Sequence, residues 1–286
     1  MHIGLQFPNL ELDADPSAIR ELAQGAEALG FHHLTAFEHV LGTTDGQRAG
    51  QQSYDPTVLI HEPMTLLSFI AAVTSRIELV TSVLVLPQRQ TALVAKQTAE
   101  LNLLSGGRLR LGVGVGWNET EFGGMGADFT TRGLRATEQI EVLRLLWTQR
   151  SVTYHGRFHH LTASGITVSP VQRPIPIWMG GSSEPAIRRL GLLGDGWMPM
   201  AEELGTVRNV MAHAREIAVE AGRAPDAIGL QGRFALASVP PEEWQTRCDA
   251  WAETGATHLV VGTRGAGFTT SAEHLRLAES FLARIS

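Results

Sequence analysis

Two neighbouring residues, Glu38 and His39, form an acid–base pair where the β-rich segment His33–Glu38 ends. A carboxylate beside an imidazole can accept, hold or donate a proton near neutral pH. Simple packing, or interaction with a helix dipole, would also account for such a pair. At a strand end that faces a cavity, however, ionisable side chains favour a functional role.

The segment Gly180-Gly181-Ser182-Ser183 precedes a stretch with helical spacing. Exposed N–H groups and two hydroxyls at the start of a helix can bind a phosphate, with support from the helix dipole. A plain turn between a strand and a helix is an equally good interpretation of this segment taken alone.

Large aromatic rings and glycines end other β-rich segments. Trp117 follows Gly114-Val115-Gly116, and Trp197 follows Gly196. These ends add no nucleophile with its base, no set of metal ligands and no pair of opposed carboxylates. Rings and small residues with few acids and bases are typical of a site for a flat cofactor that supplies its own reactivity.

Eight short β-rich segments position these residues, and helical patterns alternate with them. The first helix is predicted to begin at Asp15-Pro16, with a capping carboxylate and a proline in its first turn, and to end at Gly30. Later helices are predicted at 62–74, 93–104, up to about 147, 184–193, 202–221, 241–253 and 271–285. The predicted strands are His2–Phe7, His33–Glu38, Ile77–Leu84, Leu109–Gly114, Ile175–Met179, Gly196–Met200, Ile228–Leu236 and His258–Val261.

This alternation breaks once, at about residues 150–172, where Val152–His159 is predicted as a small β-hairpin with a turn at His155-Gly156. Eight β/α units with right-handed crossovers close most naturally as a barrel. The predicted fold is therefore α/β, a (β/α)8 TIM barrel with a small β-hairpin insertion, as one domain over residues 1–286. An open doubly wound sheet is the weaker alternative, because no fingerprint follows the first strand and no linker divides the chain.

Composition excludes several classes of protein. With 286 residues, 43% of them hydrophobic and 18% charged, the chain can bury a large core and is not disordered. The formal charge of −6 argues against nucleic-acid binding, and one cysteine excludes an internal disulfide. No apolar run reaches the roughly 18 residues that span a bilayer, and the first residues lack a signal-peptide pattern. We therefore expect a cytoplasmic protein that binds neither membranes nor nucleic acids.

Two familiar motifs fail on inspection. Gly112–Gly116 has Trp117 in place of the third glycine of a dinucleotide fingerprint, and it follows the fourth strand rather than the first. His61-Glu62 begins like the helix of a zinc protease, but Thr65 stands where the second histidine is needed.

No metal site is predicted. His155, His159 and His160 lie on the hairpin with no matching carboxylate, which favours ordinary surface packing. Cys248 shares one face of a predicted helix with two tryptophans, a spacing typical of inert core packing.

Further segments carry a likeness over most of the chain. They are Ala71-Ala72-Val73-Thr74-Ser75-Arg76-Ile77, Thr81-Ser82-Val83-Leu84-Val85-Leu86-Pro87, Leu103-Leu104-Ser105-Gly106-Gly107-Arg108, Leu111-Gly112-Val113-Gly114-Val115-Gly116-Trp117, Val171-Gln172-Arg173-Pro174 and Gly194-Asp195-Gly196-Trp197. In combination they resemble the luciferase-like family of flavin- and deazaflavin-dependent oxidoreductases, which has a TIM-barrel fold. The segments Glu38-His39-Val40-Leu41-Gly42 and Pro87-Gln88-Arg89-Gln90 are similar to the branch thought to use coenzyme F420.

The resemblance implies a role for each matching residue. Glu38 would hydrogen-bond the deazaflavin ring, and His39 would donate or accept a proton beside it. Ser82-Val83 matches a non-prolyl cis peptide behind the ring. The cofactor-binding set implied is Glu38, His39, Ser82, Val83, Val85, Val115, Gly116, Gly180, Gly181, Ser182, Ser183 and Trp197, with the last glycines and serines taking the phosphate.

Trp117 departs from the family pattern, because sugar-phosphate dehydrogenases of this family carry a catalytic glutamate at its position. A tryptophan there makes glucose 6-phosphate chemistry doubtful and suggests an apolar substrate packed over the ring. Glu38, His39 and Trp117 are thus the predicted catalytic residues.

The predicted activity is hydride transfer between C5 of coenzyme F420 and an unidentified small organic substrate. The alternative is an FMN-dependent monooxygenase that uses oxygen and a partner flavin reductase, since both cofactors share the ring and phosphate sites. A catalytically silent flavin-binding protein is a third interpretation. The loop Leu41–His61 and the insertion at Val152–Val168 are expected to cover the mouth, and the resemblance suggests a homodimer.

Overall fold

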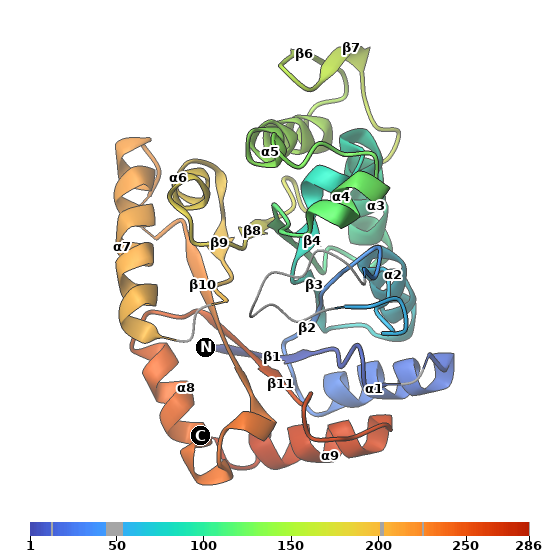
Figure 1. Ribbon diagram of the computed structural model, residues 1–286, viewed down its shortest axis with the longest axis vertical. Helices are drawn as coiled ribbons and strands as arrows, with labels where there is room; N and C mark the ends of the chain where they lie inside the picture. The colour runs from blue at the N-terminus through green and yellow to red at the C-terminus, as the bar shows by residue number, and fades with distance from the viewer. Residues whose placement is uncertain (13, 44–53, 201–202, 225, 286) are drawn as a thin grey trace.

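The computed structural model describes residues 1–12, 14–43, 54–200, 203–224 and 226–285 (Figure 1). Residues 44–53, which belong to the loop expected to cover the mouth, lie outside this described part.

Parallel strands form a closed barrel. Their order is β3-β2-β1-β11-β10-β9-β8-β5-β4, and β3 also pairs with β5 through Leu79 and Leu109, which closes the ring. The third predicted strand is divided into β3 and β4, so the barrel has the eight expected positions. The strands are β1 His2–Gln6, β2 His33–Ala36, β3 Glu78–Thr81, β4 Leu84–Val85, β5 Leu109–Gly114, β8 Ile177–Met179, β9 Gly196–Trp197, β10 Gly229–Ala235 and β11 His258–Gly262. The predicted TIM barrel is confirmed.

Helices surround the barrel (Figure 1). Asp15 caps the first one through its side chain, which accepts a hydrogen bond from the Ser17 N–H, and Pro16 opens the helix as predicted. The helices are α1 Pro16–Ala28, α2 Pro63–Val73, α3 Thr91–Leu104, α4 Glu119–Gly124, α5 Arg132–Thr148, α6 Glu184–Leu193, α7 Leu204–Glu220, α8 Trp244–Ala252 and α9 Ser271–Leu282, with 3-10 turns at Leu86–Gln88, Leu236–Ser238 and Pro241–Glu243. Among the described residues, none of these helices has the length and apolar character needed to cross a membrane.

An apolar cluster and a buried arginine lie in the barrel interior. Val80, Trp178 and Met198 form the cluster, with Val83 packed against it. The Arg110 guanidinium lies 4.4 Å from the Trp178 ring. A buried cation requires partners, and Arg110 has them: it donates to Glu78 Oε2 and to Gln231 Oε1.

Four histidines close the amino-terminal end of the barrel: His2, His32, His33 and His258. The rings of His2 and His32 stack at 4.8 Å, and the rings of His33 and His258 lie 5.6 Å apart. His33 is fully buried and neither of its ring nitrogens has a hydrogen-bond partner. A Cβ at Gly4 would lie 2.2 Å from the His33 ring, so glycine at position 4 makes room for this imidazole.

Burial and nearby positive charge lower the pKa of both His33 and His258. Burial, with Arg110 and the other histidines, holds the pKa of His33 well below its ordinary value. Burial and Arg110 lower the pKa of His258 to about 3. Both rings are therefore neutral in the folded protein near neutral pH.

The predicted hairpin is present as β6 Val152–His155 and β7 His160–Ser164, an antiparallel pair with a longer turn than expected. It lies on the outer side of α5 (Figure 1), not over the strand ends. The expectation that its histidines lack a carboxylate is wrong, because Glu138 of α5 lies 2.8 Å from His159 Nδ1. His159 Nε2 in turn lies 2.6 Å from the Thr91 hydroxyl, which fastens the hairpin tip to the first turn of α3.

Cys248 lies in the core, as its spacing predicts. It is buried on α8 together with Trp244 and Trp251. Burial raises the pKa of its thiol to about 11, so the thiolate is a minor species near neutral pH.

Candidate active site

The break between β3 and β4 forms the floor of the site. The Ser82–Val83 peptide bond is cis, as the resemblance implies. Val83 lies on the apolar cluster of the barrel interior, between the ends of β5 and β8. A Cβ at Gly114 would lie 2.7 Å from Val83, and one at Gly180 would lie 3.6 Å from it. Glycine at these two positions therefore leaves Val83 without a covering side chain from either of them.

Glu38 is buried at the end of β2, and both of its carboxylate oxygens have partners within the chain. The Val85 N–H donates to one oxygen, and Arg89 donates to the other. Arg89 also donates to Glu62 at 2.8 Å. Burial raises the pKa of Glu38 despite the opposing effect of Arg89.

These contacts differ from the role that the resemblance implies for Glu38. The side chain of Glu38 is only 1% exposed, and it accepts the backbone N–H of Val85 in β4 together with the guanidinium of Arg89. Glu38 therefore positions β4 and Arg89.

His39 follows immediately and is accessible. Its side chain is 10% exposed, and its Nδ1 lies 3.0 Å from Glu121 Oε2. The Tyr54 ring covers it at a centroid distance of 4.5 Å, and the Trp117 ring meets it edge-on at 5.7 Å. The predicted pair of His39 and Trp117 thus comes together, although 78 positions separate the two residues in the printed sequence.

Glu121 is a site residue that the sequence analysis did not find. It lies on α4 and is fully buried. Its other oxygen accepts hydrogen bonds from the N–H groups of Val40 at 2.6 Å and Leu41 at 3.2 Å. Burial alone would raise the pKa of Glu121, but the hydrogen bonds from His39, Leu41 and Val40 hold it below its ordinary value.

A sequence signal for Glu121 does exist. Asn118 caps α4, and its side chain accepts the Glu121 N–H at 3.3 Å. An asparagine followed three residues later by a glutamate is a helix-start pattern. That pattern places Glu121 in a first turn beside Trp117, but it does not reveal His39 as the partner.

The predicted phosphate loop is exposed, and a buried tryptophan holds it in place. Gly181, Ser182 and Ser183 precede α6, and Gly181 adopts a φ of +95°, which favours glycine. No described residue accepts the N–H groups of these three residues. The indole of Trp197 donates to the Gly181 carbonyl at 2.8 Å and is itself fully buried. Trp197 therefore supports the loop through its indole and leaves no surface of its own exposed.

Glycine is also required at position 116, next to Val115. Gly116 has a φ of +73°, and a Cβ there would lie 2.6 Å from Val85 and 2.8 Å from Phe122. This close packing sets the path of the chain from β5 into Trp117.

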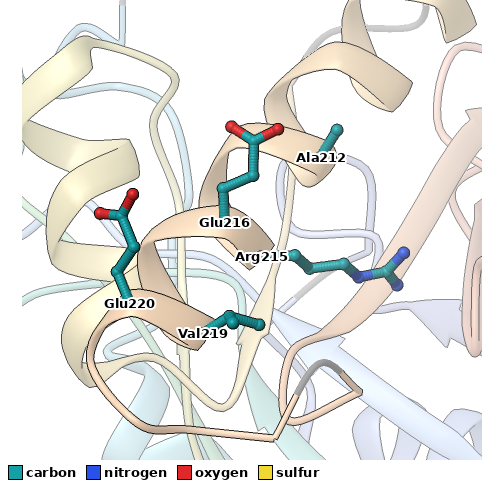
Figure 2. A pocket seen from close by; sticks show the side chains of 5 residues that line it. All are labelled: Ala212, Arg215, Glu216, Val219 and Glu220. Carbon is teal, nitrogen blue, oxygen red and sulfur yellow. The ribbon is translucent and has the colours of Figure 1, made fainter.

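A separate hollow of about 390 Å³ lies on the outer face of α7 (Figure 2). Figure 2 shows that its five lining side chains all come from this one helix: Ala212, Arg215, Glu216, Val219 and Glu220. We assign no function to it. Among the described residues, no group of three histidine, cysteine or acidic side chains has the geometry of a metal site.

A family model decides the family. Residues 3–280 match the model of the luciferase-like monooxygenases. The chain belongs to this family. An uncharacterised relative from Mycobacterium tuberculosis is 32% identical over 275 residues, which cover 91% of this chain and 90% of the relative.

Two characterised relatives differ in their cofactors. An F420-dependent glucose-6-phosphate dehydrogenase of Kineococcus radiotolerans is 34% identical over 143 residues, which cover 48% of this chain and 42% of the relative. An FMNH2-dependent dimethylsulfone monooxygenase of Pseudomonas putida is 33% identical over 171 residues, which cover 58% of this chain and 44% of the relative. The solved structure of an F420-dependent secondary alcohol dehydrogenase shares the fold, with a TM-score of 0.80, 18% identity and coverage of 99% and 98% of the two chains. This luciferase-like chain is thus a member of a family of flavin- or F420-dependent oxidoreductases.

Proposed function

We propose that this luciferase-like protein is an F420-dependent oxidoreductase that transfers a hydride between C5 of the deazaflavin and a small organic substrate. The observation that carries the proposal is the placement of His39 beside Trp117 and Tyr54, with Nδ1 occupied by Glu121. Hydride transfer to a carbonyl carbon needs a proton for the oxygen, and we assign the exchange of that proton to His39.

The residues of the chain suit a flat cofactor with a phosphate. Gly114 and Gly180 place no side chain against Val83, which leaves it open for a ring. We assign Val115 and Gly116, which follow Gly114 in the chain, to the border of that ring. The N–H groups of Gly181, Ser182 and Ser183, with the two serine hydroxyls, suit a phosphate at the start of α6. When bound, F420 would supply or accept the hydride.

The aromatic rings around His39 favour an apolar substrate. Trp117 and Tyr54 offer flat apolar surfaces, whereas the carboxyl groups of Glu38 and Glu121 already have hydrogen-bond partners within the chain. We propose a carbonyl compound, an activated alkene or the corresponding alcohol, packed against Trp117.

The second candidate is an FMN-dependent monooxygenase that uses oxygen and a partner flavin reductase. The relative from Pseudomonas putida favours it. The same ring surface and phosphate loop would serve FMN, so direct binding measurements must distinguish the two cofactors.

The test is a titration of the purified protein with F420 and with FMN, followed by fluorescence. Tight F420 binding with weak FMN binding supports the first proposal, and the reverse supports the monooxygenase. Stopped-flow oxidation of reduced F420 by candidate substrates then tests the chemistry. A loss of turnover in His39→Ala with retained F420 binding supports the role of His39, whereas His155→Gln on the hairpin serves as the control.

Tight cofactor binding without turnover with either oxygen or reduced F420 would instead indicate a silent binding protein. A homodimer and a cytoplasmic location belong to the same proposal. Light scattering coupled to size-exclusion chromatography tests the first, and cell fractionation tests the second.

A further inference from the structure

We propose that Glu121 is the positioning residue that fixes His39 in one tautomer, with the ring proton on Nδ1. Nε2 is then the ring atom that exchanges a proton with the substrate. The part that concerns the substrate rests on the proposed function, but the tautomer itself does not.

The geometry assigns a separate task to each oxygen of Glu121. Oε1 accepts hydrogen bonds from the backbone N–H groups of Val40 and Leu41, which fixes the two residues that follow His39. Oε2 lies 3.0 Å from Nδ1 of His39. A residue that only anchored the loop would need the first oxygen alone.

An ionised carboxylate can accept hydrogen bonds but cannot donate one. Glu121 is 1% exposed, and three hydrogen bonds converge on it, which keeps its pKa low and its carboxyl group ionised. The Nδ1 of His39 must therefore be the donor. In a neutral imidazole this leaves Nε2 without a proton, so Nε2 is an acceptor.

Neighbouring rings hold the imidazole in place. Tyr54 lies over it at 4.5 Å, tilted by 33°, and Trp117 meets it at 5.7 Å with an interplanar angle of 68°. In the described structure, the titratable groups seen against His39 are the carboxylate of Glu121 from α4 and the phenol of Tyr54. A flipped ring would lose the contact with Glu121.

The proton balance follows from this arrangement. In alcohol oxidation, Nε2 would take the proton as the O–H bond breaks, and F420, when bound, would accept the hydride as the C–H bond breaks. The imidazolium that forms lies against the charge of Glu121, which stabilises it. In carbonyl reduction, the same Nε2–H returns the proton to the oxygen. A buried acid that orients a histidine and stabilises its cation is an established catalytic arrangement in hydrolases.

Glu121→Gln is the discriminating variant. Its carboxamide oxygen can still accept the N–H groups of Val40 and Leu41, while its NH2 group donates to Nδ1. The ring proton then moves to Nε2, which inverts the tautomer without removing the loop anchor. Glu119→Gln, on the exposed side of α4, is the matched control.

The primary readout is ¹⁵N NMR of histidine-labelled protein without cofactor, at a pH where His39 is neutral. The His39 resonance is assigned by its loss in His39→Ala. We expect the Nδ1–H tautomer in the wild type and in Glu119→Gln, and the Nε2–H tautomer in Glu121→Gln. A wild-type spectrum of the Nε2–H tautomer would overturn the proposal, even where Glu121→Gln fails to fold.

Activity supplies the second readout. An inverted tautomer is expected to lower kcat by about 10³–10⁴-fold with little change in KM, as in other enzymes with an acid–histidine pair. Unchanged kcat and an unchanged pH profile in a folded Glu121→Gln variant would contradict the inference. If F420 does not bind at all, the proposed function fails, whereas the NMR result on the tautomer stands by itself.

Discussion

The histidines at the amino-terminal end of the barrel make the stability of the fold sensitive to mild acid. His33 is fully buried, and its pKa in the folded protein lies well below its ordinary value. In the unfolded chain it titrates near 6.5. The unfolded state therefore binds a proton that the folded state does not, so the free energy of unfolding falls as the pH drops below about 6.5.

The magnitude follows from this difference in proton binding. Between pH 7.5 and pH 5.0, one histidine that titrates only in the unfolded state lowers the free energy of unfolding by about 2 kcal/mol. That is a large share of the roughly 5–15 kcal/mol that holds a typical domain folded. His258, whose pKa is lowered to about 3, acts in the same direction. The acidic residue Glu27, with a pKa of about 2, loses its contribution only below about pH 4.5, outside this window.

The assay is urea unfolding at pH 7.5 and pH 5.0, followed by circular dichroism and tryptophan fluorescence. His33→Leu removes the titrating group, and it breaks no hydrogen bond because neither ring nitrogen of His33 has a partner. From pH 7.5 to pH 5.0, we expect the free energy of unfolding of this variant to fall by about 2 kcal/mol less than that of the wild type. His155→Gln, at an exposed position of the hairpin, controls for removal of a histidine. An equal loss of stability in His33→Leu and the wild type would refute the reasoning.

Three further predictions concern the site and the core. Trp197→Phe removes the hydrogen bond to the Gly181 carbonyl, so we expect cofactor affinity to fall several-fold in calorimetry and stability to fall by about 1 kcal/mol; an unchanged Kd would contradict the supporting role of Trp197. Gly116→Ala places a Cβ 2.6 Å from Val85 at a φ of +73° and should destabilise the protein by about 1–3 kcal/mol, seen as a lower Tm in thermal denaturation. Cys248, buried and with its pKa raised to about 11, should react with Ellman's reagent only as the protein unfolds; rapid labelling in native buffer would show that the core around it opens.

Hydrophobic patterning was sufficient to predict the barrel, because each strand and helix is a local feature with its own period. Even the hairpin was found at the correct place. The predicted strand Ile77–Leu84 is instead two pieces, β3 and β4, on either side of Ser82–Val83. The apolar run continues across this break, so periodicity alone could not locate it, whereas the family likeness did.

The sequence alone could not predict which side chains from distant parts of the chain pair with one another. His39 pairs with Glu121, which is 82 residues away, and Glu38 pairs with Arg89, which is 51 residues away. His159 of the hairpin pairs with Glu138 of α5, a partner that the sequence analysis did not consider. Such pairs depend on which loops meet at one end of the barrel. No local pattern encodes that meeting, so these partners could be identified only from the structure.

The edge-on contact between Trp117 and His39 gives the protein an intrinsic optical probe. An imidazolium quenches the emission of an adjacent indole more strongly than a neutral imidazole does. The two rings lie 5.7 Å apart, so the protonation of His39 should alter the brightness of Trp117. Fluorescence spectra recorded against pH, with a variant that lacks Trp117 as the blank, can therefore follow the charge of this histidine without added dye, label or substrate.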